Sequence, residues 1–304
     1  MRITNRTMNN NLLRNLNRSM GRLDKINNQL ASKRQISVPS DDPVKAGVIL
    51  RLRTSVRETE QYIRNTDSAI SWLDATDVVL SDVINVIHRA KELATTGAST
   101  HLDETSKKAL ADEVAQLHDS LLQLANSTHG GRYLFGGQKT NEPPFEAVPG
   151  QGKISTVNFK GDYGDIEYEI GVGVTMAVNL KMIEDSDGKT VPFGQLFDVL
   201  GQLYDELSGT GEPDEDSSVL GSLEEALDNV LQLVSEVGGK QNRVELASER
   251  LKDLRLNVIQ LMSEAEDVDY AETIMHLKME EFAYRTALSV GARIIQPSLV
   301  DFLR

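Results

Sequence analysis

The chain has 304 residues, of which 39% are hydrophobic, 5% aromatic and 26% charged, and its formal net charge is −14 at pH 7. So few aromatic residues favour long amphipathic helices over one large compact core. The lack of cysteine excludes disulfide bonds. No apolar run is long enough for a membrane span or a signal-peptide core, so we expect no membrane insertion and no cleaved signal peptide.

The charge is unevenly distributed along the chain. Residues 1–64 carry 13 Lys and Arg against 5 Asp and Glu, whereas residues 139–239 carry 5 against 20. A basic N-terminal end would suit an acidic partner surface. Nucleic acid is not an expected partner, because the first 60 residues contain no aromatic side chain on which a base could stack.

The N-terminal third predicts two helices separated by a hinge. The first runs over residues 9–33. Asp42 is an expected N-cap and Pro43 an expected first helical residue, because proline lacks the N–H group that a helix start leaves unpaired. The second helix should run from Pro43 to Thr95, ending at Gly97, with mainly apolar seam positions that alternate by three and four residues from Ile49 to Ala94.

A third helix is predicted over residues 104–126, with Leu110, Val114, Leu117, Leu121 and Leu124 on one face and the second helix as its partner. Paired glycines after His129 then predict a tight hairpin. Short alternating runs follow, which predict antiparallel strands over 154–159, 166–170 and 174–178.

Two further helices are expected before the C-terminus. The first covers residues 195–207. The second is expected to open at a capping box from Ser222 to Glu225 and to continue through Gly238-Gly239, after an acidic, glycine-rich loop at 208–218. Beyond it, apolar residues repeat every three or four positions, as in a coiled-coil seam, at Val244, Ala247, Leu251, Leu254, Val258, Leu261, Ala265 and Val268.

A coiled-coil seam needs a partner helix, and the other end of the chain offers apolar residues at helical spacing, Leu12, Leu16, Met20, Leu23, Ile26 and Leu30. We therefore predict a mainly α protein, an elongated coiled-coil helical rod built from both termini, with a small β-rich inserted middle domain. The expected divisions are a terminal helical stem of residues 1–36 and 270–304, a helical rod of residues 37–140 and 220–269, and an outer domain of residues 141–219.

The sequence offers no set of residues typical of an enzyme. Its five histidines have neither the HExxH nor the HxxxH spacing that places two ligands on one helix face, and we expect them to be solvated or to cap helices. The segment from Asp185 to Thr190 lacks the further acidic ligand of a calcium loop and predicts a plain β-turn. We expect no enzyme activity, no cofactor and no metal.

Several motifs at both ends resemble the bacterial flagellin superfamily. They are Leu30 to Ile36 with Ser40-Asp41-Asp42, then Gln241-Asn242-Arg243, Glu266 to Glu272, and Pro297 to Arg304. Within the superfamily, Gly131 to Gly137 followed by Thr140 to Phe145 is similar to hook-filament junction proteins. The middle domain carries no motif that matches a member of the superfamily.

The resemblance implies a structural protein of the flagellum that forms a junction ring between hook and filament and a platform for flagellin assembly. Implied partners are the first hook-filament junction protein, flagellin, further copies of the chain, and an export chaperone on the C-terminal region. Secretion would use the flagellar type III apparatus. The expected assembly interface comprises Leu12, Leu16, Met20, Leu23, Leu30, Met275, Phe282 and Leu288. A flagellin, or a cytoplasmic coiled-coil scaffold, are the alternatives.

Overall fold

The computed structural model describes residues 5–98, 103–148, 154–180, 183–184, 190–191, 193–209 and 219–295. Six helices and eight short strands lie in this part of the chain. In order they are α1 (Asn5–Ser32), α2 (Pro43–Gly97), α3 (Glu104–Ala125), β1 (Thr128–His129), β2 (Arg132–Tyr133), β3 (Phe145–Val148), β4 (Thr156–Phe159), β5 (Glu167–Gly171), β6 (Val174–Ala177), β7 (Ile183–Glu184), β8 (Thr190–Val191), α4 (Phe193–Ser208), α5 (Val219–Glu266) and α6 (Tyr270–Ile295). This confirms the predicted fold class, a mainly α chain with a small middle region of antiparallel strand pairs.

The chain forms two compact units, to which α2 and α5 both contribute. Unit 1 comprises residues 1–58 and 254–304, and unit 2 comprises residues 59–253. The predicted boundaries of the inserted domain, near residues 141 and 219, fall inside unit 2, and the three-part division remains a prediction.

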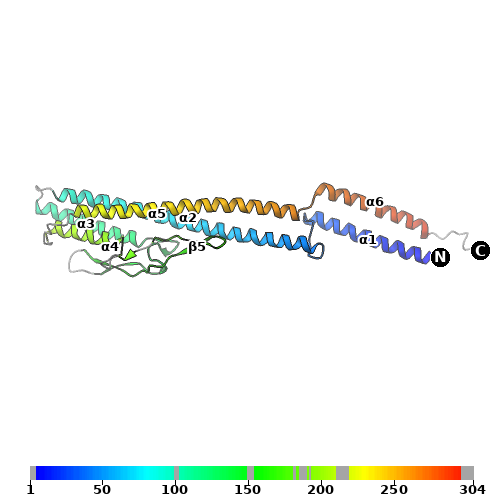
Figure 1. The fold of residues 1–304 in the computed structure, drawn as a ribbon, viewed down its shortest axis with the longest axis horizontal. Coiled ribbons are helices and arrows are strands. Elements are labelled where there is room, and N and C mark those ends of the chain that lie inside the picture. Colours follow the sequence, from blue (N-terminus) through cyan, green and yellow to red (C-terminus); the bar gives the residue numbers. More distant parts are fainter. Residues whose placement is uncertain are drawn as a thin grey trace, which may run out of the picture. The chain divides into compact units, whose positions relative to one another are not determined.

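In unit 1, α1 and α6 lie side by side and antiparallel (Figure 1). The predicted pairing of the two chain ends is thus present, but the predicted partner segment was wrong. The seam after Val244 belongs to α5 and lies along α2, to which it is joined by Gln241 with Asp74 in unit 2 and by Arg53 with Glu266 in unit 1. Heptad spacing signals that a partner exists but does not select which helix it is.

Two predicted helix starts had different outcomes. Asp42 caps α2 as expected, because its Oδ1 accepts the backbone N–H groups of Val44 and Lys45, both at 3.0 Å. The capping box at Ser222 was wrong, since α5 already begins at Val219 and Ser222 lies inside the helix. The helix continues through Gly238-Gly239, as predicted.

Unit 2 is a bundle in which α2 and α5 are joined by α3 and α4. Here α2 buries part of the predicted seam, including Leu73, Leu80 and Ile87, and a second stripe beside it, which includes Trp72, Val79, Val83 and Val86. The extra stripe follows from the extra helices, because α2 no longer packs against a single partner. The third helix also packs mainly on α4, not only on α2 as predicted.

The buried face of α3 includes Val114 and Leu121 as predicted, but its other members lie one residue later than the predicted ones. Its most buried side chains are Ala111, Val114, His118, Leu121 and Ala125. The prediction that the histidines are solvated or capping is wrong for His118, which is 2% exposed. Its ring lies edge-on to Phe197 of α4, with ring centroids 5.2 Å apart. Burial lowers the pKa of His118, since an apolar environment disfavours the imidazolium, and the charge of Asp119 opposes this only in part.

The strands form four antiparallel hairpins among the described residues, β1-β2, β3-β4, β5-β6 and β7-β8. The predicted glycine turn is present, with Gly130 at φ 58° and Gly131 at φ 78°, the left-handed conformations that a tight hairpin turn requires. Strand β3 was not predicted. Residues 185–189 and 210–218, the predicted turn and acidic loop, lie outside the described residues.

A two-stranded ribbon is marginally stable by itself, so each hairpin must pack on something else. Phe145 of β3 is 3% exposed, and its ring lies 5.2 Å from Phe159 of β4 and 5.6 Å from Phe193 of α4. Asn126, the C-cap of α3, both donates to the carbonyl of Phe145 and accepts from its N–H group. The β3-β4 hairpin is therefore built onto the helices of unit 2.

Candidate assembly surface

The α1-α6 pair buries little apolar surface along its contact. Of the predicted interface residues, Leu12, Leu16, Leu23 and Leu30 are half-buried on the contact side of α1. The fully buried positions are small or polar: Ser19 on α1, with Thr273 and Gly291 on α6. The two helices therefore approach closely but gain less from the hydrophobic effect than the helices of unit 2.

Gly291 shows how close the approach is. A Cβ atom at this position would lie 2.5 Å from Cδ2 of Leu12, well inside van der Waals contact. Glycine thus allows the α6 backbone to pack directly on a leucine of α1.

A carboxylate on α6 supplies the polar part of the same contact. Glu280 accepts from Nε of Arg22 at 2.7 Å, from a second guanidinium nitrogen at 3.1 Å, and from the hydroxyl of Ser19 at 3.1 Å. The Arg22 hydrogen bond lowers the pKa of Glu280, and Glu280 raises the pKa of Arg22. Because a lowered carboxyl pKa stabilises the folded state only while the group is ionised, this contribution is lost as the pH falls through the lowered pKa.

The face of α6 opposite this contact is apolar and exposed. Phe282 lies nine residues before Gly291, about two and a half helical turns, which places it on the opposite side of the helix. We call Met275, Met279, Phe282 and Val290 the α6 stripe; they are 56%, 52%, 74% and 47% exposed. Exposed large apolar side chains at regular helical spacing are typical of a surface that a partner covers.

The structure thus divides the predicted interface residues into two groups. Leu12, Leu16, Leu23 and Leu30 face α6 within the same chain, whereas Met20, Met275, Phe282 and Leu288 are exposed. Sequence reasoning did not place Met279 or Val290 in the interface. Their spacing from Met275, four and fifteen residues, would have placed both near that face of a helix.

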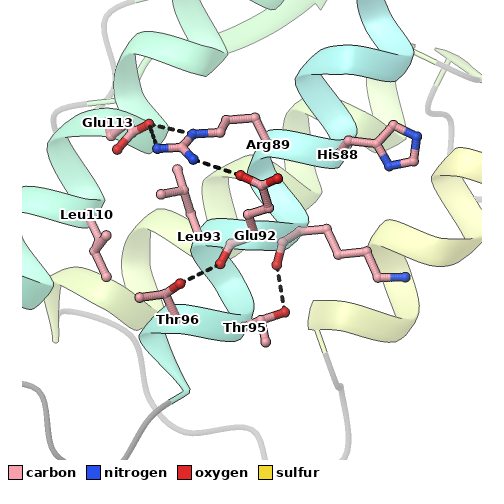
Figure 2. A pocket seen from close by; sticks show the side chains of 9 residues that line it. His88, Arg89, Glu92, Leu93, Thr95, Thr96, Leu110 and Glu113 are labelled. Carbon is pink, nitrogen blue, oxygen red and sulfur yellow. Dashed lines mark hydrogen bonds and ion pairs between the residues drawn. The ribbon is translucent and has the colours of Figure 1, made fainter.

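The pocket between α2 and α3 in unit 2 has a volume of about 730 Å³. Figure 2 shows Arg89 between Glu92 and Glu113, with dashed lines to both carboxylates. Arg89 is paired with Glu92 at 2.7 Å and with Glu113 at 2.6 Å, and Thr96 donates to a backbone carbonyl of its own helix. Arg89, Glu92, Glu113 and Thr96 therefore have partners within the protein.

The described residues contain no group of three or more His, Cys, Asp or Glu side chains placed to hold a metal ion. None of the helices in this part of the chain is both long enough and apolar enough to cross a membrane.

Both ends of the chain match one family. Residues 3–140 match the bacterial flagellin N-terminal helical region, and residues 220–303 match the bacterial flagellin C-terminal helical region. The chain is 26% identical to flagellar hook-associated protein 3 of Escherichia coli K12 over 302 residues, covering 94% of this chain and 95% of the relative. It is 22% identical to the flagellin of Bacillus subtilis 168, covering 96% and 94%.

Solved structures show the same fold. The flagellar junction protein FlgL of Legionella pneumophila matches with a TM-score of 0.55 at 16% identity. The match covers 74% of this chain and 100% of that structure. The paired terminal helices, the strand hairpins between them and the two family matches agree with one another. This chain therefore belongs to the bacterial flagellin family, whose members are structural proteins of the flagellum.

Proposed function

We propose that this chain is a subunit of the junction between the flagellar hook and filament, and that its α6 stripe contacts neighbouring subunits, together with the exposed Met20 and Leu288. The similarity to flagellar hook-associated protein 3 over 94% of the chain supports the junction assignment. The observation that carries the assembly surface is the exposed apolar stripe on the terminal helix pair. Within the described residues, most exposed large apolar side chains belong to unit 1, the smaller unit.

The family resemblance extends this proposal to partners and to location. The chain would form a ring on the first hook-filament junction protein and would present a platform to flagellin. A flagellar export chaperone would hold the C-terminal region before secretion through the flagellar type III apparatus, without a cleaved signal peptide. A charged substitution on the stripe should then affect assembly and leave the single chain folded.

Complementation of a deletion strain tests the proposal. Loss of the junction protein should leave hooks that release unassembled flagellin into the medium, whereas loss of a flagellin leaves capped hooks. Phe282→Asp should be exported but fail to restore filaments. Phe282 is 74% exposed in the single chain, so the charge costs little there, but it would cost several kcal/mol once buried without a partner.

Val172→Asp is the matched control. Val172 is also a large apolar residue, 82% exposed, but it lies at the tip of the β5-β6 hairpin in unit 2. The Val172→Asp variant should restore filaments fully. Equal loss of function in both variants would contradict the assignment of the surface to the α6 stripe, and capped hooks in the deletion strain would favour a flagellin.

A further inference from the structure

One buried carboxylate connects three segments of unit 1. Glu266, the last residue of α5, is 4% exposed. It is paired with Nε of Arg34 at 2.5 Å and with the guanidinium of Arg53. Arg34 follows α1 in the hinge and Arg53 lies on α2, so residues more than 200 positions apart meet at one side chain.

We infer that Glu266, Arg34 and Arg53 form a latch that positions the turn out of α1 and the turn into α6. The inference concerns the geometry of these two turns, and its consequence for assembly rests on the proposed function. The latch residues themselves are positioning residues, since none of them belongs to the α6 stripe.

The backbone beside the latch forms a very short antiparallel bridge. The N–H of Gln35 donates to the carbonyl of Glu266 at 2.7 Å, and the N–H of Val268 donates to the carbonyl of Lys33 at 3.2 Å. Arg34 and Asp267 are the bridge partners. So short a bridge cannot hold two distant segments together unaided, because isolated strand pairs are marginal even when longer.

The conformation of Lys33 supports the same reading. It has φ 61°, the left-handed region that glycine adopts freely and other residues adopt at a cost. Such a residue persists only where its surroundings hold it in place. Here the bridge holds its carbonyl, and the ion pair of Arg34 holds the next residue.

The charges of the latch predict how its parts depend on one another. Glu266 is buried, whereas the side chains of Arg34 and Arg53 are 52% and 39% exposed. Removal of both arginines would leave a buried carboxylate with neither of its cationic partners, which is more costly than a neutral amide at the same place. Glu266→Gln should therefore partly rescue a chain that lacks both arginines.

The rate of trypsin cleavage after Lys33 measures how often the hinge between α1 and α2 opens. In the full-length chain, Glu266→Gln should speed cleavage there by about tenfold or more, because cleavage follows the population of the open hinge. Glu264→Gln is the control, since Glu264 is an exposed residue of the same helix and accepts from the nearby Gln260. Both variants should keep the wild-type urea transition of Trp72, the single tryptophan, which lies in the core of unit 2.

Equal cleavage rates in Glu266→Gln and Glu264→Gln would overturn the latch, and so would a loss of unit 2 stability that accounts for the faster cleavage. The rescue supplies a second test. The Arg34→Gln, Arg53→Gln double variant should be cleaved faster than the triple variant that also carries Glu266→Gln, and the reverse order would refute the shared carboxylate.

The link to assembly is tested separately by complementation. The Glu266→Gln chain should be exported but should restore fewer filaments than Glu264→Gln. Normal filament formation with a loosened hinge would overturn the positioning role. Failure of the junction assignment would instead show in the deletion strain itself, and would leave the trypsin result unchanged.

Discussion

Replacement of Phe145 by alanine tests whether the strand region folds with the helices or as a separate outer domain. The ring of Phe145 contacts three other aromatic rings, those of Phe159, Phe193 and Phe197, at centroid distances of 5.2, 5.6 and 5.9 Å. Two of these rings are on α4. If the hairpin and the helices form one cooperative unit, the cavity should destabilise both.

The expected cost is about 3–5 kcal/mol, the range for removal of a buried phenylalanine side chain. With a urea dependence of about 2 kcal/mol/M, the unfolding midpoint should fall by about 1.5–2.5 M. Trp72 reports the transition by fluorescence, because it is buried on α2 and its ring lies against His129 in the β1-β2 hairpin. It is therefore a probe of the helices of unit 2 and not of β3 or β4.

Val148→Ala is the control on the same strand. Val148 is 41% exposed, so its truncation should change stability by less than about 0.5 kcal/mol. If Phe145→Ala left the Trp72 transition in place, the strands would unfold independently. That result would refute a single cooperative unit and would support the separate inserted domain of residues 141–219 that the sequence predicts.

Three further substitutions test other contacts. The pKa of His118 is lowered from 6.5, so the unfolded chain takes up a proton first as the pH falls, and unit 2 should lose stability below about pH 6.5. His118→Leu should therefore flatten the dependence of the Trp72 urea midpoint on pH. An unchanged slope would show that His118 is not the cause. Gly291→Val should push α6 away from Leu12 and speed hydrogen exchange along α1, with unit 2 exchange unaffected. Asp162→Ala should cost about 1–2 kcal/mol in the same urea assay, because Asp162 accepts the N–H groups of Gln138 and Gly164, both at 2.8 Å; a cost near zero would show that water replaces the carboxylate.

Local features of the structure could be predicted from the sequence because their causes lie within a few residues. The N-cap Asp42 before Pro43 determines where α2 begins, and the glycine pair after His129 determines the hairpin turn. Apolar spacing predicted the long helices and the half-buried leucines of α1. The expected assembly interface included Met275 and Phe282, although the sequence did not tell whether the chain itself or a partner covers them.

The choice of partner for each helix depends on contacts between segments far apart in the chain. A heptad seam indicates that a partner helix is needed, and both α1 and α2 offered suitable spacing, so the α5 seam was assigned to the wrong one. The burial of His118 depends on α4, which lies about 75 positions away in sequence and carries no local signal at α3. The latch has the same origin, because a glutamate at the end of a helix reads as solvated charge until Arg34 and Arg53 are brought to it. Apolar spacing thus indicated which segments are helical and which of their faces are apolar, whereas the pairing of segments far apart in the chain decided which of those faces remain exposed.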